Sequence, residues 1–137
     1  MSTSRRTFLA AAAATALVNQ SMATQAGAAA AVNTYPKVVH HVFFWLKDPA
    51  SKEDLAKLLK GLSTLAQIES VRGAHFGVPA STEKRDVVDN SYSASEILFF
   101  DDTAGQKTYQ DHPIHKRFVE DCSHLWERVV VYDAISV

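Results

Sequence analysis

Three features are scarce in this chain of 137 residues: cysteine, net charge and long apolar runs. The single cysteine, Cys122, excludes an intramolecular disulfide, and its apolar neighbours predict a buried, inert thiol. The formal net charge of −1 predicts no nucleic-acid partner and no basic patch for an anionic membrane. The apolar stretch from Ala10 to Val18 is shorter than the roughly 20 residues that span a bilayer, which argues against a membrane anchor.

The N-terminal segment has the order of an export signal. Arg5 and Arg6 precede the uncharged apolar stretch, and Ala26-Gly27-Ala28 then offers the small residues that a signal peptidase reads. This order is typical of a twin-arginine (Tat) signal peptide. We therefore expect a signal peptide over 1–31, a short linker over 32–37 and one mature domain over 38–137. We expect the mature protein to be periplasmic or secreted, without stable membrane insertion after cleavage.

The mature chain alternates between strand and helix patterns. Ser51 with Asp54, and Thr103 with Gln106, resemble the capping boxes that begin helices. The segment Pro79 to Asn90 is polar and rich in turn residues, and it is either a functional lid or a mobile loop. The predicted elements are strands over 38–46, 71–78, 92–100 and 128–137, a helix from 51 to about 69, a short helix over 103–109 and a final helix that begins at Pro113.

The order of these elements, βαββααβ, predicts an α+β fold of the ferredoxin-like kind, with helices on one face of a four-stranded antiparallel sheet. The strand over 38–46 is apolar on both sides, with Val42 and Phe44 on one side and Phe43 and Trp45 on the other. Helices on one face cover only one of these sides. We therefore expect a second sheet from an identical subunit, which gives a homodimeric α+β barrel.

The six histidines do not predict a metal site. His40 and His41 are neighbours on one strand and so point to opposite faces, and His112 and His115 have no carboxylate beside them at a familiar zinc spacing. His40 lies on an apolar face, where it is either a hydrogen-bonded core histidine or a functional group. Glu96 also lies among apolar residues, and a pair with His40 across neighbouring strands would satisfy both side chains.

Tyr109 and His115 flank the break between the last two predicted helices. A helix N-terminus supplies free N–H groups and positive potential, so an acid/base pair there could meet an enolate or a carbonyl oxygen. The alternative is that Tyr109 packs in the core with its hydroxyl at the surface and that His115 caps or solvates a helix.

Four segments of the mature domain carry a recognisable pattern: VVHHVFFWLK from position 38, the strand from Tyr92 into Phe99-Phe100-Asp101, the motif YQDHPIH over 109–115 and the closing run from Trp126-Glu127 to Tyr132-Asp133. In these segments the domain resembles the Dabb (stress-responsive dimeric A/B barrel) family over nearly its whole length. The resemblance implies a ferredoxin-like dimer that needs no cofactor. One plant member is a polyketide cyclase, and by motif its catalytic histidine corresponds to His115, its tyrosine to Tyr109 and its first-strand histidine to His40, whereas a third-strand histidine is replaced by Ala94.

Three functions stay open at this point. The first is a binding protein that holds a small hydrophobic or carbonyl-containing molecule in one pocket per subunit. The second is a cofactor-free lyase or cyclase that uses His115 as a base and Tyr109 to steady an oxyanion, with His40 nearby. The third is a stress-associated structural dimer without a ligand. The residues that we expect to bind a ligand are Val42, Phe44, Glu96, Leu98 and Phe118.

Overall fold

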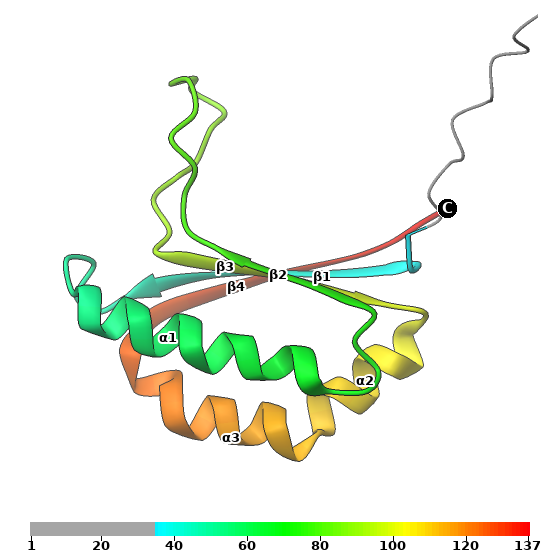
Figure 1. The fold of residues 1–137 in the computed structure, drawn as a ribbon. Helices are drawn as coiled ribbons and strands as arrows, with labels where there is room; N and C mark the ends of the chain where they lie inside the picture. The colour runs from blue at the N-terminus through cyan, green and yellow to red at the C-terminus, as the bar shows by residue number, and fades with distance from the viewer. Residues whose placement is uncertain (1–34) are drawn as a thin grey trace, which may run out of the picture. The chain divides into compact units, whose positions relative to one another are not determined.

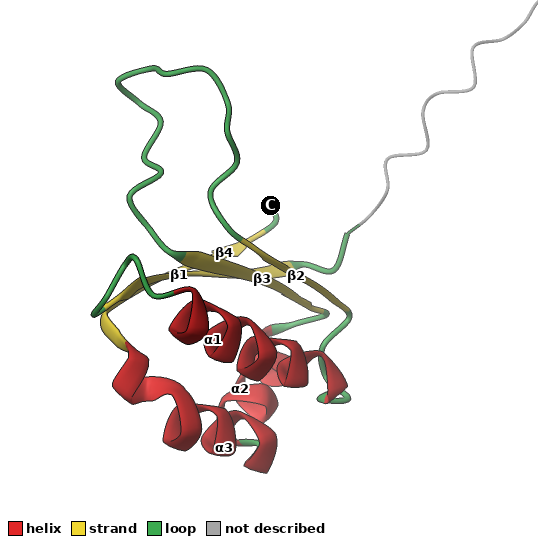
Figure 2. Ribbon diagram, turned by 60° about the vertical axis from the view of Figure 1, so that its left-hand side comes forward, coloured by secondary structure: helices red, strands yellow, loops and turns green. Residues whose placement is uncertain are grey.

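The computed structural model describes residues 35–137, so the predicted signal peptide lies outside the described residues. The described chain forms one antiparallel sheet with strand order β2-β3-β1-β4, and its helices cover one face of that sheet (Figures 1 and 2). The predicted α+β class is confirmed. The elements are β1 (Val38–Leu46), α1 (Lys52–Thr64), β2 (Gly73–Gly77), β3 (Ala94–Phe100), α2 (Thr103–Asp111), α3 (Pro113–Cys122) and β4 (Trp126–Ile135), with short 3-10 turns over Leu65–Gln67 and Ser123–Leu125.

The alternation of β1 separates a helix-facing side from an outer side. Val38, His40, Val42, Phe44 and Leu46 are buried beneath the helices, whereas the residues between them are only half-buried. The core on the helix-facing side is completed by apolar residues of α1, β3 and α3, namely Leu58, Leu62, Leu98, Phe100, Phe118 and Cys122. None of the helices in residues 35–137 has the length and apolarity needed to cross a bilayer.

The helix starts follow local hydrogen bonding, with one correction. Ser51 caps α1 as predicted, because its side chain accepts from the N–H of Asp54. The cap of α2 is Asp102 and not Thr103: the Asp102 carboxylate accepts from the N–H of Gly105 at 2.7 Å, and Thr103 is already the first helical residue. Pro113 occupies the first turn of α3, where its missing N–H is harmless.

Helices α1 and α3 approach each other closely at Gly61. A Cβ atom added there would lie 2.6 Å from the Cys122 Sγ and 3.1 Å from the Phe118 ring. Cys122 is buried and its pKa is raised by burial, which agrees with the predicted inert thiol. The glycine that lowers the helix propensity of α1 therefore permits the contact that holds α3 over the sheet.

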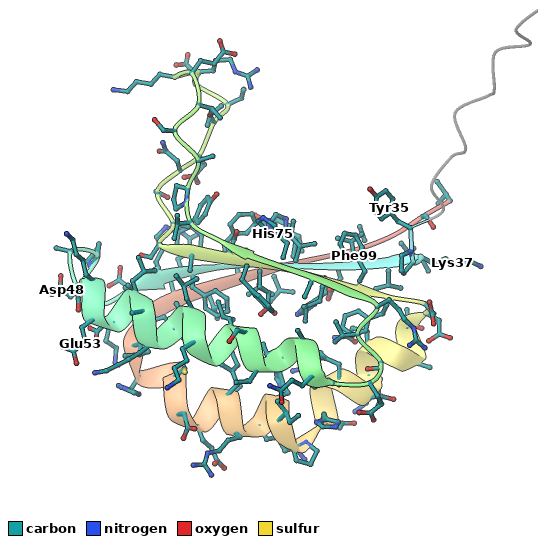
Figure 3. All side chains as sticks on the ribbon, in the orientation of Figure 1. Tyr35, Lys37, Asp48, Glu53, His75 and Phe99 are labelled. Atoms are coloured by element: carbon teal, nitrogen blue, oxygen red, sulfur yellow. The ribbon has the colours of Figure 1, made fainter. Side chains whose placement is uncertain are left out.

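The outer side of the sheet is aromatic and has no covering layer within the described chain. The rings of His41 and Phe43 lie 4.1 Å apart, and Phe43 also contacts Tyr92 and Tyr132. Figure 3 shows His75 and Phe99 on this side, opposite the helices. The connection between β2 and β3 extends away from the sheet in the same direction (Figure 1).

Candidate functional site

A half-open cavity of about 180 Å³ lies between the helix-facing side of the sheet and helices α2 and α3. Seven of the eight predicted site residues line it. The exception is Leu98, which is fully buried in the core and does not reach the cavity. The lining residues are His40, Val42, Phe44, Glu96, Tyr109, Gln110, His115, Phe118, Val119, Trp126, Val129 and Val131.

His40 is held by a carboxylate on the neighbouring strand. The register of β1 with β4 places His40 opposite Asp133, and the two side chains meet at 2.6 Å between Nδ1 and Oδ1. Because an ionised carboxylate only accepts, Nδ1–H donates, so the tautomer that fits this contact has its lone pair on Nε2. The ring is buried while the Asp133 side chain is 55% exposed, so the pair runs from the core to the solvent.

Glu96 is the most deeply buried ionisable group in the cavity wall apart from Tyr109. It is 2% exposed, and burial raises its pKa from 4.5 to about 7. The Tyr109 hydroxyl donates to Oε1 at 3.2 Å, which only partly offsets that rise. The second oxygen, Oε2, is buried and has no hydrogen-bond partner. In a large share of the molecules, the Glu96 carboxyl is therefore neutral at neutral pH.

The predicted cross-strand pair between Glu96 and His40 is present only as a long contact. Glu96 lies opposite Val42, whereas His40 lies opposite Leu98, so the two side chains are diagonal neighbours. Their closest atoms, Nε2 and Oε1, are 3.9 Å apart, which is an ion-pair distance but too long for a hydrogen bond. Asp133 and Tyr109 are instead the direct partners of the two groups.

Tyr109 and His115 meet at the break between α2 and α3, as predicted. Their rings are 4.7 Å apart, and the Tyr109 ring also lies 5.6 Å from His40. Tyr109 is only 1% exposed and its hydroxyl points inward to Glu96, so the alternative of a surface hydroxyl is wrong. Its pKa is raised strongly, first by burial and then by Glu96, which keeps the phenol protonated.

His115 is half-buried beside the cavity. Burial lowers its pKa, and the backbone of Gln110 opposes this through a hydrogen bond. The ring is therefore neutral at neutral pH and can act as a hydrogen-bond acceptor or a proton acceptor. His112, which belongs to the same sequence motif, has a structural role instead, because its Nδ1 accepts from the N–H of Ile114 and caps α3.

The structure adds site residues that were not predicted from the sequence. Asp133 and the wall residues Trp126, Val129 and Val131 all come from β4. Strict alternation along β4 places Val129, Val131 and Asp133 on one side, which is a signal that was available in the sequence. The pairing of β4 with β1 then decides that this side faces the cavity. Within residues 35–137, no three histidine, cysteine or acidic side chains gather as a metal site would require.

The buried carboxyl predicts a pH-dependent stability difference for Glu96→Gln. Because the pKa of the Glu96 carboxyl is raised in the folded state, the wild-type protein loses stability as pH rises from about 4.5 to about 7. The variant does not, because its amide stays neutral over this range. The variant should be more stable than wild type above pH 7, by up to about 3 kcal/mol, and this gain should vanish near pH 4. Urea unfolding at pH 4 and pH 8, at equal protein concentrations, measures the difference.

The matched control for this experiment is Glu127→Gln, which removes an exposed carboxylate at the start of β4. It should show little change at either pH, since surface charges contribute little to stability. An equal gain for Glu96→Gln at both pH values would contradict the assignment of a neutral, buried carboxyl.

Comparison with known proteins finds a family model that matches this chain and solved structures with the same fold. The family model described as "Stress responsive A/B Barrel Domain" (Dabb) matches residues 38–136. No protein of curated function is significantly similar in sequence. An Arabidopsis thaliana protein of known crystal structure is 25% identical, with a TM-score of 0.62, and the match covers 73% of this chain and 95% of that chain.

Two further structures show the same fold at lower identity. The hydroxynitrile lyase from Passiflora edulis is 19% identical with a TM-score of 0.61, and the match covers 74% of this chain and 95% of the lyase. A dimeric ferredoxin-like protein of unknown function from Thermobifida fusca is 20% identical with a TM-score of 0.59, and the match covers 72% of this chain and 90% of that chain. The match of the family model over most of the chain shows that the protein belongs to the stress-responsive A/B barrel (Dabb) family.

Proposed function

We propose that this protein is a homodimer in which each subunit binds a small, largely hydrophobic molecule with a carbonyl group in the cavity lined by His40, Glu96 and Tyr109. One observation carries the proposal: Glu96 lines that cavity, and its Oε2 atom is buried without a hydrogen-bond partner. A polar atom in that position carries a desolvation penalty that a ligand atom at hydrogen-bond distance would relieve.

The shape and lining of the cavity suit such a ligand. Its volume of about 180 Å³ is somewhat larger than the ~150 Å³ of an apolar cavity that takes up benzene, so a single-ring compound with a short substituent fits. The apolar lining includes Val42, Phe44, Phe118 and Trp126, and the polar groups come from β1, β3, α2 and the first turn of α3. This division orients a ligand that has one apolar end and one oxygen. A closed-core structural dimer would not need the cavity.

The outer face of the sheet supports the homodimer. Phe43 packs with His41 and Tyr132 there, and the Tyr132 side chain is left 62% exposed. Water in contact with such a face costs free energy, and a second sheet would remove it. The Thermobifida fusca protein of the same fold is described as dimeric.

Cofactor-free proton transfer next to a carbonyl is the second candidate function, and the His40–Asp133 contact favours it. A carboxylate that fixes the tautomer of an imidazole leaves its other nitrogen ready to accept a proton. His115 is the other candidate base, because its lowered pKa keeps it neutral. Tyr109 would steady the oxyanion that forms. The likeness to a hydroxynitrile lyase extends to the fold and carries no assignment of the reaction.

Export by the Tat pathway belongs to the same proposal. It is supported by Arg5 and Arg6 ahead of an apolar stretch, and by the small residues at positions 26–28. A signal over 1–31 would leave the whole Dabb region, residues 38–136, in the exported protein. Its site of action would be the periplasm or the medium.

The cavity assignment predicts that Val131→Trp blocks ligand binding. Val131 lies at the cavity wall on the edge strand and is 47% exposed, so a larger side chain can enter the cavity without disrupting the core. We expect acetophenone to bind wild type saturably and to lose at least about tenfold in affinity in the variant, as measured by ligand-observed NMR at about pH 6. Val137→Trp at the exposed C-terminus is the matched control. Equal affinities in all three proteins would place the ligand elsewhere.

The enzyme hypothesis predicts exchange of the methyl protons of acetophenone. A base that removes a proton next to the carbonyl lets deuterium from D₂O take its place, so the methyl signal in the proton NMR spectrum declines. His40→Ala should slow this exchange by about a hundredfold or more if His40 is the base, and His115→Ala should do so if His115 is. His124→Ala, which is exposed and outside the cavity, should not change it. Exchange at the buffer rate with wild-type protein would leave binding as the function.

The homodimer predicts that a charge on the outer face separates the subunits. Phe43→Glu should shift the mature protein from dimer to monomer in sedimentation velocity runs, because the carboxylate would be buried without a partner. Ala56→Glu places the same charge on the exposed side of α1 and should leave the dimer intact. A wild-type protein that stays monomeric at about 100 µM would rule out the barrel.

A further inference from the structure

We propose that Glu96 recognises the ligand as a hydrogen-bond donor, with the proton on Oε2, so that the cavity selects uncharged carbonyl compounds over carboxylates of the same shape. The inference rests on the proposed function, in that the cavity of His40, Glu96 and Tyr109 holds a carbonyl compound. It assigns the preference for uncharged ligands to one residue of β3, Glu96.

The two oxygens of Glu96 have different surroundings. Oε1 accepts from the Tyr109 hydroxyl at 3.2 Å and lies 3.9 Å from the His40 Nε2. Oε2 has no partner at all, although it is buried and its residue lines the cavity. A proton on Oε2 leaves the existing contact with Tyr109 in place and turns the orphaned acceptor into a donor. A carbonyl oxygen in the cavity is the acceptor that such a donor requires.

Tyr109 is less suited to donating to a ligand. Its only proton is directed to Oε1 of Glu96 in the structure, so the phenol can donate to a ligand only by giving up that hydrogen bond. The raised pKa of Glu96, about 7, supports a protonated carboxyl at neutral pH and below. The group that donates to the ligand is thus the carboxyl, and the tyrosine holds it in place.

The charges around Glu96 disfavour an anionic ligand. The groups that face it are His40 from β1, Tyr109 from α2 and His115 from α3, with Asp133 of β4 behind His40. None of the lining residues is lysine or arginine. His115 is kept neutral by burial, and any positive charge on His40 is countered by the Asp133 carboxylate at 2.6 Å. A ligand carboxylate would therefore be desolvated without a fixed cation to pair with it.

The experiment measures the affinity of three probes of similar shape for the mature dimer: acetophenone, benzoate and 1-phenylethylamine. We expect acetophenone to bind at least about tenfold more tightly than benzoate at about pH 6. Its affinity should fall by about tenfold or more between pH 6 and pH 8.5, because only the protonated carboxyl donates. Glu96→Gln keeps an N–H donor that does not titrate, so it should bind acetophenone equally at both pH values. Glu127→Gln should behave as wild type does.

A second measurement reports on the carboxyl without a ligand. The ¹³C NMR signal of the Glu96 Cδ, assigned by its absence in Glu96→Gln, should titrate near pH 7. Titration in the range of ordinary glutamates, pH-independent acetophenone binding, or benzoate bound as tightly as acetophenone would overturn the inference and leave the cavity assignment standing. Binding of the amine that is equally tight at pH 6 and at pH 8.5 would overturn it as well, because Glu96 would then already be ionised at pH 6. Failure of acetophenone to bind at any pH would overturn both this inference and the proposed function.

Discussion

The antiparallel register of β1 with its two neighbours determines the chemistry of the cavity. It sets His40 opposite Asp133 and places Glu96 diagonally from His40, with all three on the side that faces the helices. A shift by one residue in the pairing of β1 with β3 would turn Glu96 to the outer face. The same shift in the pairing of β1 with β4 would turn Asp133 there and leave His40 without its partner. The positions of the polar groups therefore depend on the alternation of apolar residues along the strands, because the burial of Val42 and Phe44 fixes the register.

Within the cavity the polar side chains constrain one another. Tyr109 donates to Glu96, Glu96 is too far from His40 to share a proton directly, and His40 is engaged by Asp133. Burial then sets the protonation states: it raises the pKa values of Glu96 and Tyr109 and lowers that of His115. The result is a cavity with few permanent charges, which is suited to a neutral ligand and to proton transfer between weak acids and bases.

The two faces of the sheet have different surroundings. On one face, α1 and α3 pack closely because Gly61 lets them approach, and they enclose the core and the cavity. On the other face, aromatic side chains are left half-exposed. A domain of this size buries limited apolar surface by itself, so pairing of the outer faces in a homodimer would also stabilise the fold around the cavity.

Much of the fold follows from the sequence alone. The period-two pattern of β1, the cap at Ser51 and the break at His112-Pro113 are local signals, and they predicted the order of elements and the α+β class. Together with the resemblance to the Dabb family, the sequence also predicted seven of the residues that line the cavity. The tertiary structure decided what local signals do not contain. The strand register makes Asp133, and not Glu96, the direct partner of His40. Packing buries Leu98 in the core instead of at the cavity. It also directs the Tyr109 hydroxyl inward and leaves one oxygen of Glu96 without a partner. Strand pairing, the burial of side chains and the desolvation of their polar groups all depend on contacts between segments far apart in the chain. This is why the sequence determined the scaffold and only the folded structure determined the chemistry of its cavity.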